Sequence, residues 1–262
     1  MILKEIMKRL IISFLLLSGY NLYSQPVHYT TANVHSHNDY EQATPFWLAY
    51  NEGFGSMEAD IFLQDSELLV AHERKELVLH RTLETSYLRN LQQCIKKNNN
   101  HPYADTSRRL QLLIDIKTDA VTTLNKLVEI LKKYPTLINN HSLTFVITGN
   151  RPEASDFGSY PSFIYFDGEL SKTYSNEALK KIVLLSDNFK TYSQWNGEGV
   201  MNETELTLLK STIAKAHQLN KPVRFWNAPD FENAWNHFMR LNVDYINTDH
   251  IKEIATFLQK LP

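Results

Sequence analysis

Charged residues in the first half of the chain form two pairs, each with a spacing of two. Glu58 and Asp60 lie in SMEADIFL, and Asp115 and Lys117 lie in LLIDIKTD. Side chains alternate between the faces of a strand, so each pair is predicted to share one face. Converging carboxylates repel one another unless a cation offsets their charge, and Mg²⁺ or Ca²⁺ prefers such oxygen ligands. Glu58, Asp60 and Asp115 are therefore predicted to bind Mg²⁺ or Ca²⁺.

Histidines lie next to these pairs in the sequence. His35 and His37 follow an apolar segment in NVHSHNDY, and His72 follows a second one in LLVAH. Histidine titrates near neutral pH, so it can act as general base or general acid. Lys117 adds a positive charge that suits an anionic substrate such as phosphate. The combination predicts metal-assisted phosphoryl chemistry.

The segments that must position these residues alternate between strand-like and helix-like patterns. Eight short strands separated mainly by helices favour one α/β domain, a (β/α)8 TIM barrel, with its chemistry at the carboxyl ends of the strands. No Pro/Gly/Ser-rich linker divides the chain. The predicted strands are 30–35, 56–62, 111–117, 143–148, 163–167, 182–186, 223–227 and 244–247, with a short extended piece at 68–71.

Residues 1–24 are predicted to be a signal peptide, which leaves 25–262 as the barrel domain. Three cationic residues precede an apolar run at 10–17 that is too short to span a bilayer, and small or polar residues follow. Cys94 is the only cysteine and is interpreted as a helix packing residue, so no internal disulfide can form. An exported protein without disulfides indicates the bacterial periplasm or cell surface.

Composition excludes several classes of partner. The chain has 262 residues, a net charge of −2, a pI of about 6.6 and no Lys/Arg-rich block, so nucleic acid is not an expected partner. No apolar stretch approaches the roughly 20 residues that span a bilayer, so at most peripheral membrane contact is expected. The expected partner is a small-molecule or lipid-derived phosphodiester.

The motifs HSHNDY, EADI, VAH, LLIDIKTD, FVITGN, RFWN and VDYINTD together resemble the glycerophosphodiester phosphodiesterase-like superfamily of phospholipase C-type barrels. The nearer match is to the branch that contains altered inheritance of mitochondria protein 6 and its bacterial relatives. The resemblance implies a TIM-barrel phosphodiester hydrolase that depends on a divalent metal. It implies the metal ligands Glu58, Asp60 and Asp115, the acid/base pair His35 and His72, and Lys117 as the residue that neutralises phosphate charge.

The sequence departs from the wider superfamily after its first strand. The usual His-Arg-Gly is replaced by His35-Ser36-His37, so the phosphate-contacting arginine is missing there. Lys117 or Arg224 is the expected substitute. Either His35 or His37 could be the catalytic histidine, and His35 is favoured because it directly follows the apolar strand. The residues expected to contact substrate at the barrel mouth are His37, Arg224 and Trp226.

Two other functions fit parts of the pattern. His35, His37 and Asp249 resemble the ligands of a metal-dependent amidohydrolase barrel, but strands five and six end in YFDG and LLSDN, without the further histidines. Asp249 could instead cap the final helix. A barrel that binds a phosphorylated ligand without turnover is the non-enzymatic alternative. For a hydrolase, direct attack by water and a cyclic-phosphate route both remain open.

Overall fold

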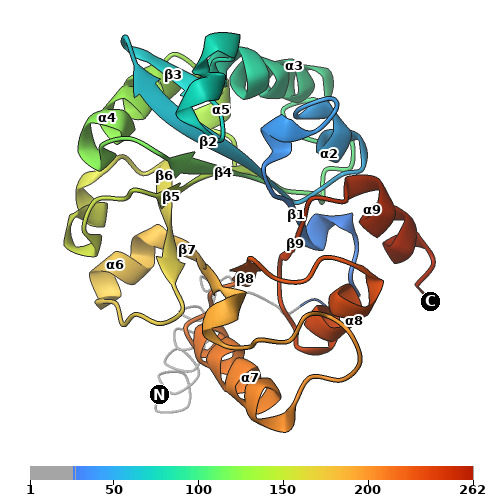
Figure 1. Ribbon diagram of the computed structural model, residues 1–262. Helices are drawn as coiled ribbons and strands as arrows, with labels where there is room; N and C mark the ends of the chain where they lie inside the picture. The colour runs from blue at the N-terminus through green and yellow to red at the C-terminus, as the bar shows by residue number, and fades with distance from the viewer. Residues whose placement is uncertain (1–25, 27, 262) are drawn as a thin grey trace, which may run out of the picture.

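Parallel strands surround a central axis, with helices outside them (Figure 1). The computed structural model describes residue 26 and residues 28–261, so the predicted signal peptide lies outside the described residues. The barrel strands occur in the order β8-β7-β6-β5-β4-β2-β1-β9. They are β1 (Val34–Ser36), β2 (Ser56–Gln64), β4 (Leu110–Ile116), β5 (Leu143–Gly149), β6 (Ile164–Glu169), β7 (Ile182–Asn188), β8 (Val223–Trp226) and β9 (Ile246–Thr248).

One isolated parallel bridge, between Arg224 and Tyr245, joins β8 to the segment before β9. The barrel is therefore nearly closed, which confirms the predicted (β/α)8 architecture. The extended piece expected at 68–71 is β3 (Glu67–Val70), which pairs antiparallel with the outer end of β2. The first strand is shorter than expected because Thr30 caps a 3₁₀ turn, η1 (Thr31–Asn33), directly before it.

The helices lie outside the barrel strands (Figure 1), and their buried apolar residues belong to the main hydrophobic cluster. Among the described residues, none of them combines the length and apolarity that crossing a bilayer requires. The α-helices are α2 (Trp47–Asn51), α3 (Arg89–Lys97), α4 (Ala120–Leu131), α5 (Pro135–Ile138), α6 (Asn176–Lys181), α7 (Glu203–Gln218), α8 (Glu232–Arg240) and α9 (Ile251–Gln259). The short connecting turns are η2 (Asp39–Glu41), η3 (Arg74–Leu79), η4 (Glu84–Leu88, a π-helical turn), η5 (Ala154–Ser159) and η6 (Phe189–Thr191).

The interior of the barrel changes from apolar to polar along each strand. Leu113, Val146 and Leu184 form one buried apolar cluster inside the barrel. Two residues further along the same strands stand Asp115, Thr148 and Ser186. Side chains two apart point the same way in a strand, so a polar layer follows the apolar one towards the carboxyl ends. Cys94 is buried on α3, in agreement with its interpretation as a packing residue.

Candidate active site

Three carboxylates meet at the mouth of the barrel. Glu58 and Asp60 lie on β2, and Asp115 lies opposite Asp60 on the neighbouring β4. One ligand oxygen from each carboxylate lies within 4.8 Å of the others. Asp60 Oδ1 and Asp115 Oδ1 are buried and have no hydrogen-bond partner. Buried polar atoms normally have a partner, so these oxygens fit a hard cation placed among the three carboxylates.

Lys117 lies against the same cluster. Its Nζ is 2.9 Å from Asp60 Oδ2 and 2.9 Å from Asp115 Oδ2. Burial, together with the charges of Glu58 and Asp115, raises the pKa of Asp60 to about 7, although Lys117 opposes this. Burial also raises the pKa of Asp115 against the effect of Lys117. One lysine therefore leaves the carboxylates under-compensated, which is the electrostatic setting that a divalent cation relieves.

His35 lies deeper in the barrel than the aspartates. It pairs in register with Ser56 at the start of β2, four residues before Asp60. Its side chain is fully buried, with Nδ1 2.7 Å from Ser56 Oγ and Nε2 2.9 Å from Glu58 Oε2. Burial and the charge of Arg224 lower the pKa of His35 to about 4, although Glu58 opposes this. His35 is thus a neutral ring whose two nitrogens are both occupied by protein groups.

Arg224 extends from β8 into the barrel interior. Its side chain is almost fully buried, and Nη1 lies 2.9 Å from His35 Nε2 and 3.1 Å from Asn247 Oδ1. The same guanidinium is 3.5 Å from Glu58 Oε2 and 3.7 Å from Asp167 Oδ2. Arg224 therefore contacts the site through Glu58 and His35 and balances two buried carboxylates.

His37 stands two residues further along and reaches the rim. Its side chain is 29% exposed, and Nδ1 lies 2.8 Å from Asp249 Oδ1, across the junction of β1 and β9. The Asp249 backbone is held by Asp230, which accepts a 2.7 Å hydrogen bond from the Asp249 N–H. Burial lowers the pKa of His37, but the hydrogen bond to Asp249 and the charges of Glu58 and Asp249 outweigh it and raise the pKa. Asp249 therefore orients His37 as well as stabilising its charged form.

His72 lies on the other side of the acidic cluster. Its side chain is 46% exposed, and Nδ1 is 3.5 Å from Asp60 Oδ2. The Tyr40 hydroxyl donates to Asp60 Oδ2 at 2.7 Å and lies 3.2 Å from His72 Nδ1. Tyr40 is a site residue that the sequence did not single out, because HSHNDY reads locally as a turn. The only available signal was its place in the same motif as His37.

The remaining residues of that motif have a structural role. Asp39 is buried and accepts hydrogen bonds from Ser36 Oγ at 2.8 Å, Phe46 N at 2.7 Å and the Tyr87 hydroxyl at 2.9 Å. Asn38 adopts a left-handed conformation with φ of 44°. Asn38 and Asp39 therefore form a turn that presents Tyr40 to the acidic cluster.

Two tryptophans near the last strands differ in exposure. Trp226 ends β8 with 40% of its surface exposed, so it is available at the rim. Trp195 is buried and its indole Nε1 donates to the Glu198 carbonyl at 2.7 Å. Trp195 therefore packs within the fold, whereas Trp226 is open to solvent.

The nearly closed barrel has the fold of solved glycerophosphodiester phosphodiesterase structures. The fold is shared with a glycerophosphodiester phosphodiesterase from Parabacteroides distasonis, which matches with a TM-score of 0.53 and 15% identity. That match covers 86% of this chain and 96% of the other.

Sequence comparison gives a more specific similarity than the fold does. The AIM6-like phosphodiesterase domain family matches residues 26–153, and the glycerophosphoryl diester phosphodiesterase family matches residues 222–251. An altered inheritance of mitochondria protein 6 homolog from Arthroderma benhamiae is 27% identical, over 83% of this chain and 81% of the relative. Altered inheritance of mitochondria protein 6 from Kluyveromyces lactis is 27% identical, over 86% of this chain and 72% of the relative. The chain is therefore similar to the AIM6-like family over residues 26–153 and to its curated relatives over most of its length.

Proposed function

We propose that this protein is a metal-dependent phosphodiester hydrolase, with a divalent cation, Mg²⁺ or Ca²⁺, held by Glu58, Asp60 and Asp115. The observation that carries the proposal is the pair of buried, unpartnered oxygens, Asp60 Oδ1 and Asp115 Oδ1, in a cluster of three carboxylates. When bound, the cation supplies positive charge to the non-bridging phosphate oxygens. Similarity to phosphodiesterase families over residues 26–153 and 222–251 supports the same conclusion.

Lys117 supplies the second positive charge at the site. Burial opposes its charged form, but Asp60 and Asp115 outweigh this and raise the pKa of Lys117, so the ammonium stays protonated. In our proposal it stabilises the negative charge that develops on phosphate oxygens in the transition state. This agrees with the role that the sequence resemblance implies for Lys117.

Proton transfer is assigned to the two accessible histidines, His37 and His72. They lie on opposite sides of the acidic cluster, with Asp249 holding Nδ1 of His37 and Asp60 beside Nδ1 of His72. One histidine deprotonates the nucleophile while the other protonates the leaving oxygen. The nucleophile is water or a neighbouring substrate hydroxyl, and the hydroxyl would give a cyclic phosphate first.

His35, which the sequence favoured over His37, is assigned a positioning role. Both of its ring nitrogens contact protein groups, and its side chain is fully buried. It holds Glu58 in place through the contact between Nε2 and Oε2. The same geometry disfavours the amidohydrolase alternative, because the Arg224 guanidinium lies 2.9 Å from the ring nitrogen that would have to bind a metal.

The proposed substrate is a small soluble or lipid-derived phosphodiester, which is encountered outside the cytoplasm. The predicted signal peptide at 1–24 supports export. For an exported protein, a single cysteine favours a bacterial periplasm or cell surface over a eukaryotic secretory route. Trp226 at the rim is proposed to contact the apolar or sugar-like part of the substrate, as aromatic side chains do in such sites.

The test is a panel of glycerophospho-, phosphoinositide-, sphingo- and nucleotide-type diesters assayed with Mg²⁺, Ca²⁺ or Mn²⁺ and with chelator. We expect metal-dependent cleavage of at least one diester, lost by about a hundredfold or more in Glu58→Gln. Glu67→Gln, an exposed glutamate on β3, is the matched control. Turnover that survives chelation or Glu58→Gln would contradict the proposal. Amide hydrolysis or tight binding without turnover would favour the two alternatives.

A further inference from the structure

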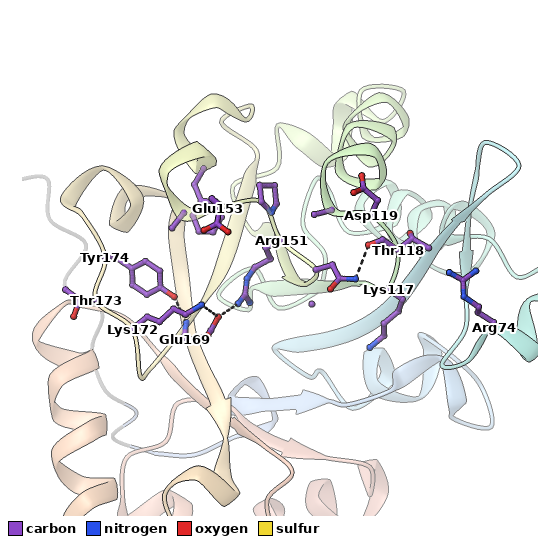
Figure 2. Close-up of a pocket in the computed structure, with 16 residues that line it drawn as sticks. Arg74, Lys117, Thr118, Asp119, Arg151, Glu153, Glu169, Lys172, Thr173 and Tyr174 are labelled. Carbon is purple, nitrogen blue, oxygen red and sulfur yellow. Dashed lines mark hydrogen bonds and ion pairs between the residues drawn. The ribbon is translucent and has the colours of Figure 1, made fainter.

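A cavity of about 850 Å³ opens beside the acidic cluster. It lies over the carboxyl ends of β4, β5 and β6, and Lys117 and Gly149 belong to its wall (Figure 2). Asp115 lies directly behind Gly149, because a β-carbon added there would collide with Asp115 Oδ1. The cavity therefore begins at the proposed reaction centre. Its volume is within the roughly 300–1,000 Å³ typical of small-molecule sites.

The cavity wall has an excess of cationic side chains. Arg74, Lys117, Arg151 and Lys172 contribute positive charge, and Asp119, Glu153 and Glu169 contribute negative charge. Asp119 is turned towards α4, where it caps the helix by accepting from Thr122 N at 2.9 Å. Its hydrogen-bonding capacity is thus partly committed to the helix terminus. A cation-rich wall of this kind favours an anionic group in the cavity.

Arg151 and Lys172 share a single carboxylate oxygen. Arg151 Nη2 donates to Glu169 Oε1 at 2.9 Å, and Lys172 Nζ donates to the same oxygen at 2.8 Å. Glu169 carries one negative charge and the two side chains carry two positive charges, so Glu169 alone does not neutralise them. Each cation also keeps unused donors, since a guanidinium has five N–H groups and an ammonium has three.

Two cations of the wall, Lys117 and Arg151, follow the ends of the neighbouring strands β4 and β5. Figure 2 shows Lys117 and Arg151 descending from neighbouring strand ends, with Lys172 on the other side of Glu169 from Arg151. Arg151 Nη1 also donates to Thr148 Oγ1 at 3.3 Å, which fixes the guanidinium over the end of β5. The Arg151 side chain is only 16% exposed, so it keeps this geometry. A planar guanidinium that is held in place suits a phosphate or carboxylate.

We propose that this cavity binds a second anionic group of the substrate, carried on the head group next to the scissile phosphate. The preferred diester then bears a phosphate or carboxylate on a polar head group, whereas a quaternary ammonium head group is disfavoured by like-charge repulsion from Arg151 and Lys172. Two experiments test this inference. The turnover experiment rests on the proposed diesterase function, whereas the binding experiment requires only that the ligand binds.

The binding arm measures inositol 4-phosphate against unphosphorylated inositol by calorimetry, with chelator present so that no metal contributes. We expect the wild-type chain to bind the phosphorylated probe, and Arg151→Gln and Lys172→Gln to weaken that binding about tenfold or more. Lys180→Gln is the matched control, because Lys180 makes the same exposed i,i+3 pair with Glu177 on α6. Equal binding by the wild type and both cavity variants would overturn the proposal.

The turnover arm compares glycerophosphoinositol with its 4-phosphate, which differ by one anionic group. We expect kcat/KM to favour the phosphorylated diester about tenfold, and Arg151→Gln to abolish that preference. Lys180→Gln, the control variant, should keep it. A preference that Arg151→Gln leaves intact would overturn the subsite. If binding behaves as expected but no diester is cleaved, the subsite stands and the proposed function fails.

The source of the anion is separated by presenting the same pair as phosphatidylinositol and its 4-phosphate in phosphatidylcholine vesicles. If the preference for the 4-phosphate depends on Arg151 both with the soluble diesters and with the vesicles, the subsite serves soluble and lipid head groups alike. A preference confined to vesicles and unchanged in Arg151→Gln would overturn it, because that pattern reports attraction to a charged surface.

Discussion

His37 Nδ1 lies 2.8 Å from Asp249 Oδ1, although the two residues are 212 positions apart. The contact exists because β9 pairs in parallel with β1, which brings the ends of the last and first barrel strands together. Asp249 is itself held by Asp230 through its backbone N–H. The pair therefore forms a fixed His–Asp unit at the rim, whereas His35 on the same strand is enclosed among protein groups.

Asp249→Asn should impair turnover without unfolding the chain. The carboxylate raises the pKa of His37, so its removal should lower that pKa and move the corresponding limb of the kcat/KM–pH profile to lower pH. We expect kcat to fall about 10–100-fold, since a misoriented histidine loses much of its acid/base effect. Asp105→Asn, an exposed loop aspartate, should change neither quantity. An unshifted profile in Asp249→Asn would argue against this role of the pair.

His35→Ala should mainly lower the stability of the chain, whereas His37→Ala should mainly lower its activity. Removal of His35 opens a cavity and leaves Glu58 with only the 3.5 Å contact of Arg224, so we expect a loss of about 2–4 kcal/mol in the free energy of unfolding. His37 is partly exposed, so His37→Ala should cost less than about 1 kcal/mol. Urea unfolding with chelator present measures both. His37→Ala should instead lower kcat by about 10²–10⁴-fold. A larger stability loss for His37→Ala than for His35→Ala would contradict the positioning role of His35.

Metal binding should compete with protons near neutral pH. Burial and neighbouring carboxylates raise the pKa of Asp60 to about 7 in the metal-free protein. Below that pH Asp60 binds a proton that a cation must displace, so affinity should rise with pH by up to about tenfold per unit and then level off above it. Calorimetry in buffers of different ionisation enthalpy counts the protons released.

Asp60→Asn is the matched control for that titration, because it keeps the size of the side chain and removes the titrating group. We expect weaker binding in this variant and a flatter dependence on pH. If the pH dependence persists unchanged in Asp60→Asn, the proton belongs to another group and the assignment to Asp60 is wrong.

Gly149→Ala should weaken metal binding by displacing Asp115. Gly149 has φ of 70°, where a side chain is strained, and a β-carbon would collide with Asp115 Oδ1 and lie 2.7 Å from the Ile116 carbonyl oxygen. Displacement of Asp115 should weaken metal binding by about tenfold or more. Gly158→Ala is the control, because nothing lies within 4 Å of a β-carbon added there and its φ is ordinary. Unaltered metal affinity in Gly149→Ala would show that Asp115 is not a ligand.

Local sequence patterns were sufficient to predict the barrel and to predict which side chains share a strand face. Apolar runs separated by helical patterns fixed the succession of strands and helices, and a spacing of two fixed that Glu58 and Asp60 share a face. These are properties of neighbours along the chain. They were sufficient to predict that Glu58, Asp60 and Asp115 converge, which the structure confirms.

The depth of a side chain in the barrel and its hydrogen-bond partners could be seen only in the folded structure. The register of β1 against β2 places His35 at the level of Ser56, below the aspartates, whereas His37 follows the end of β1. Barrel closure then gave His37 its partner Asp249, and a folded turn brought Tyr40 to Asp60. Alternation along a strand says which way a side chain points, whereas inter-strand register and closure say how deep it lies and what it meets.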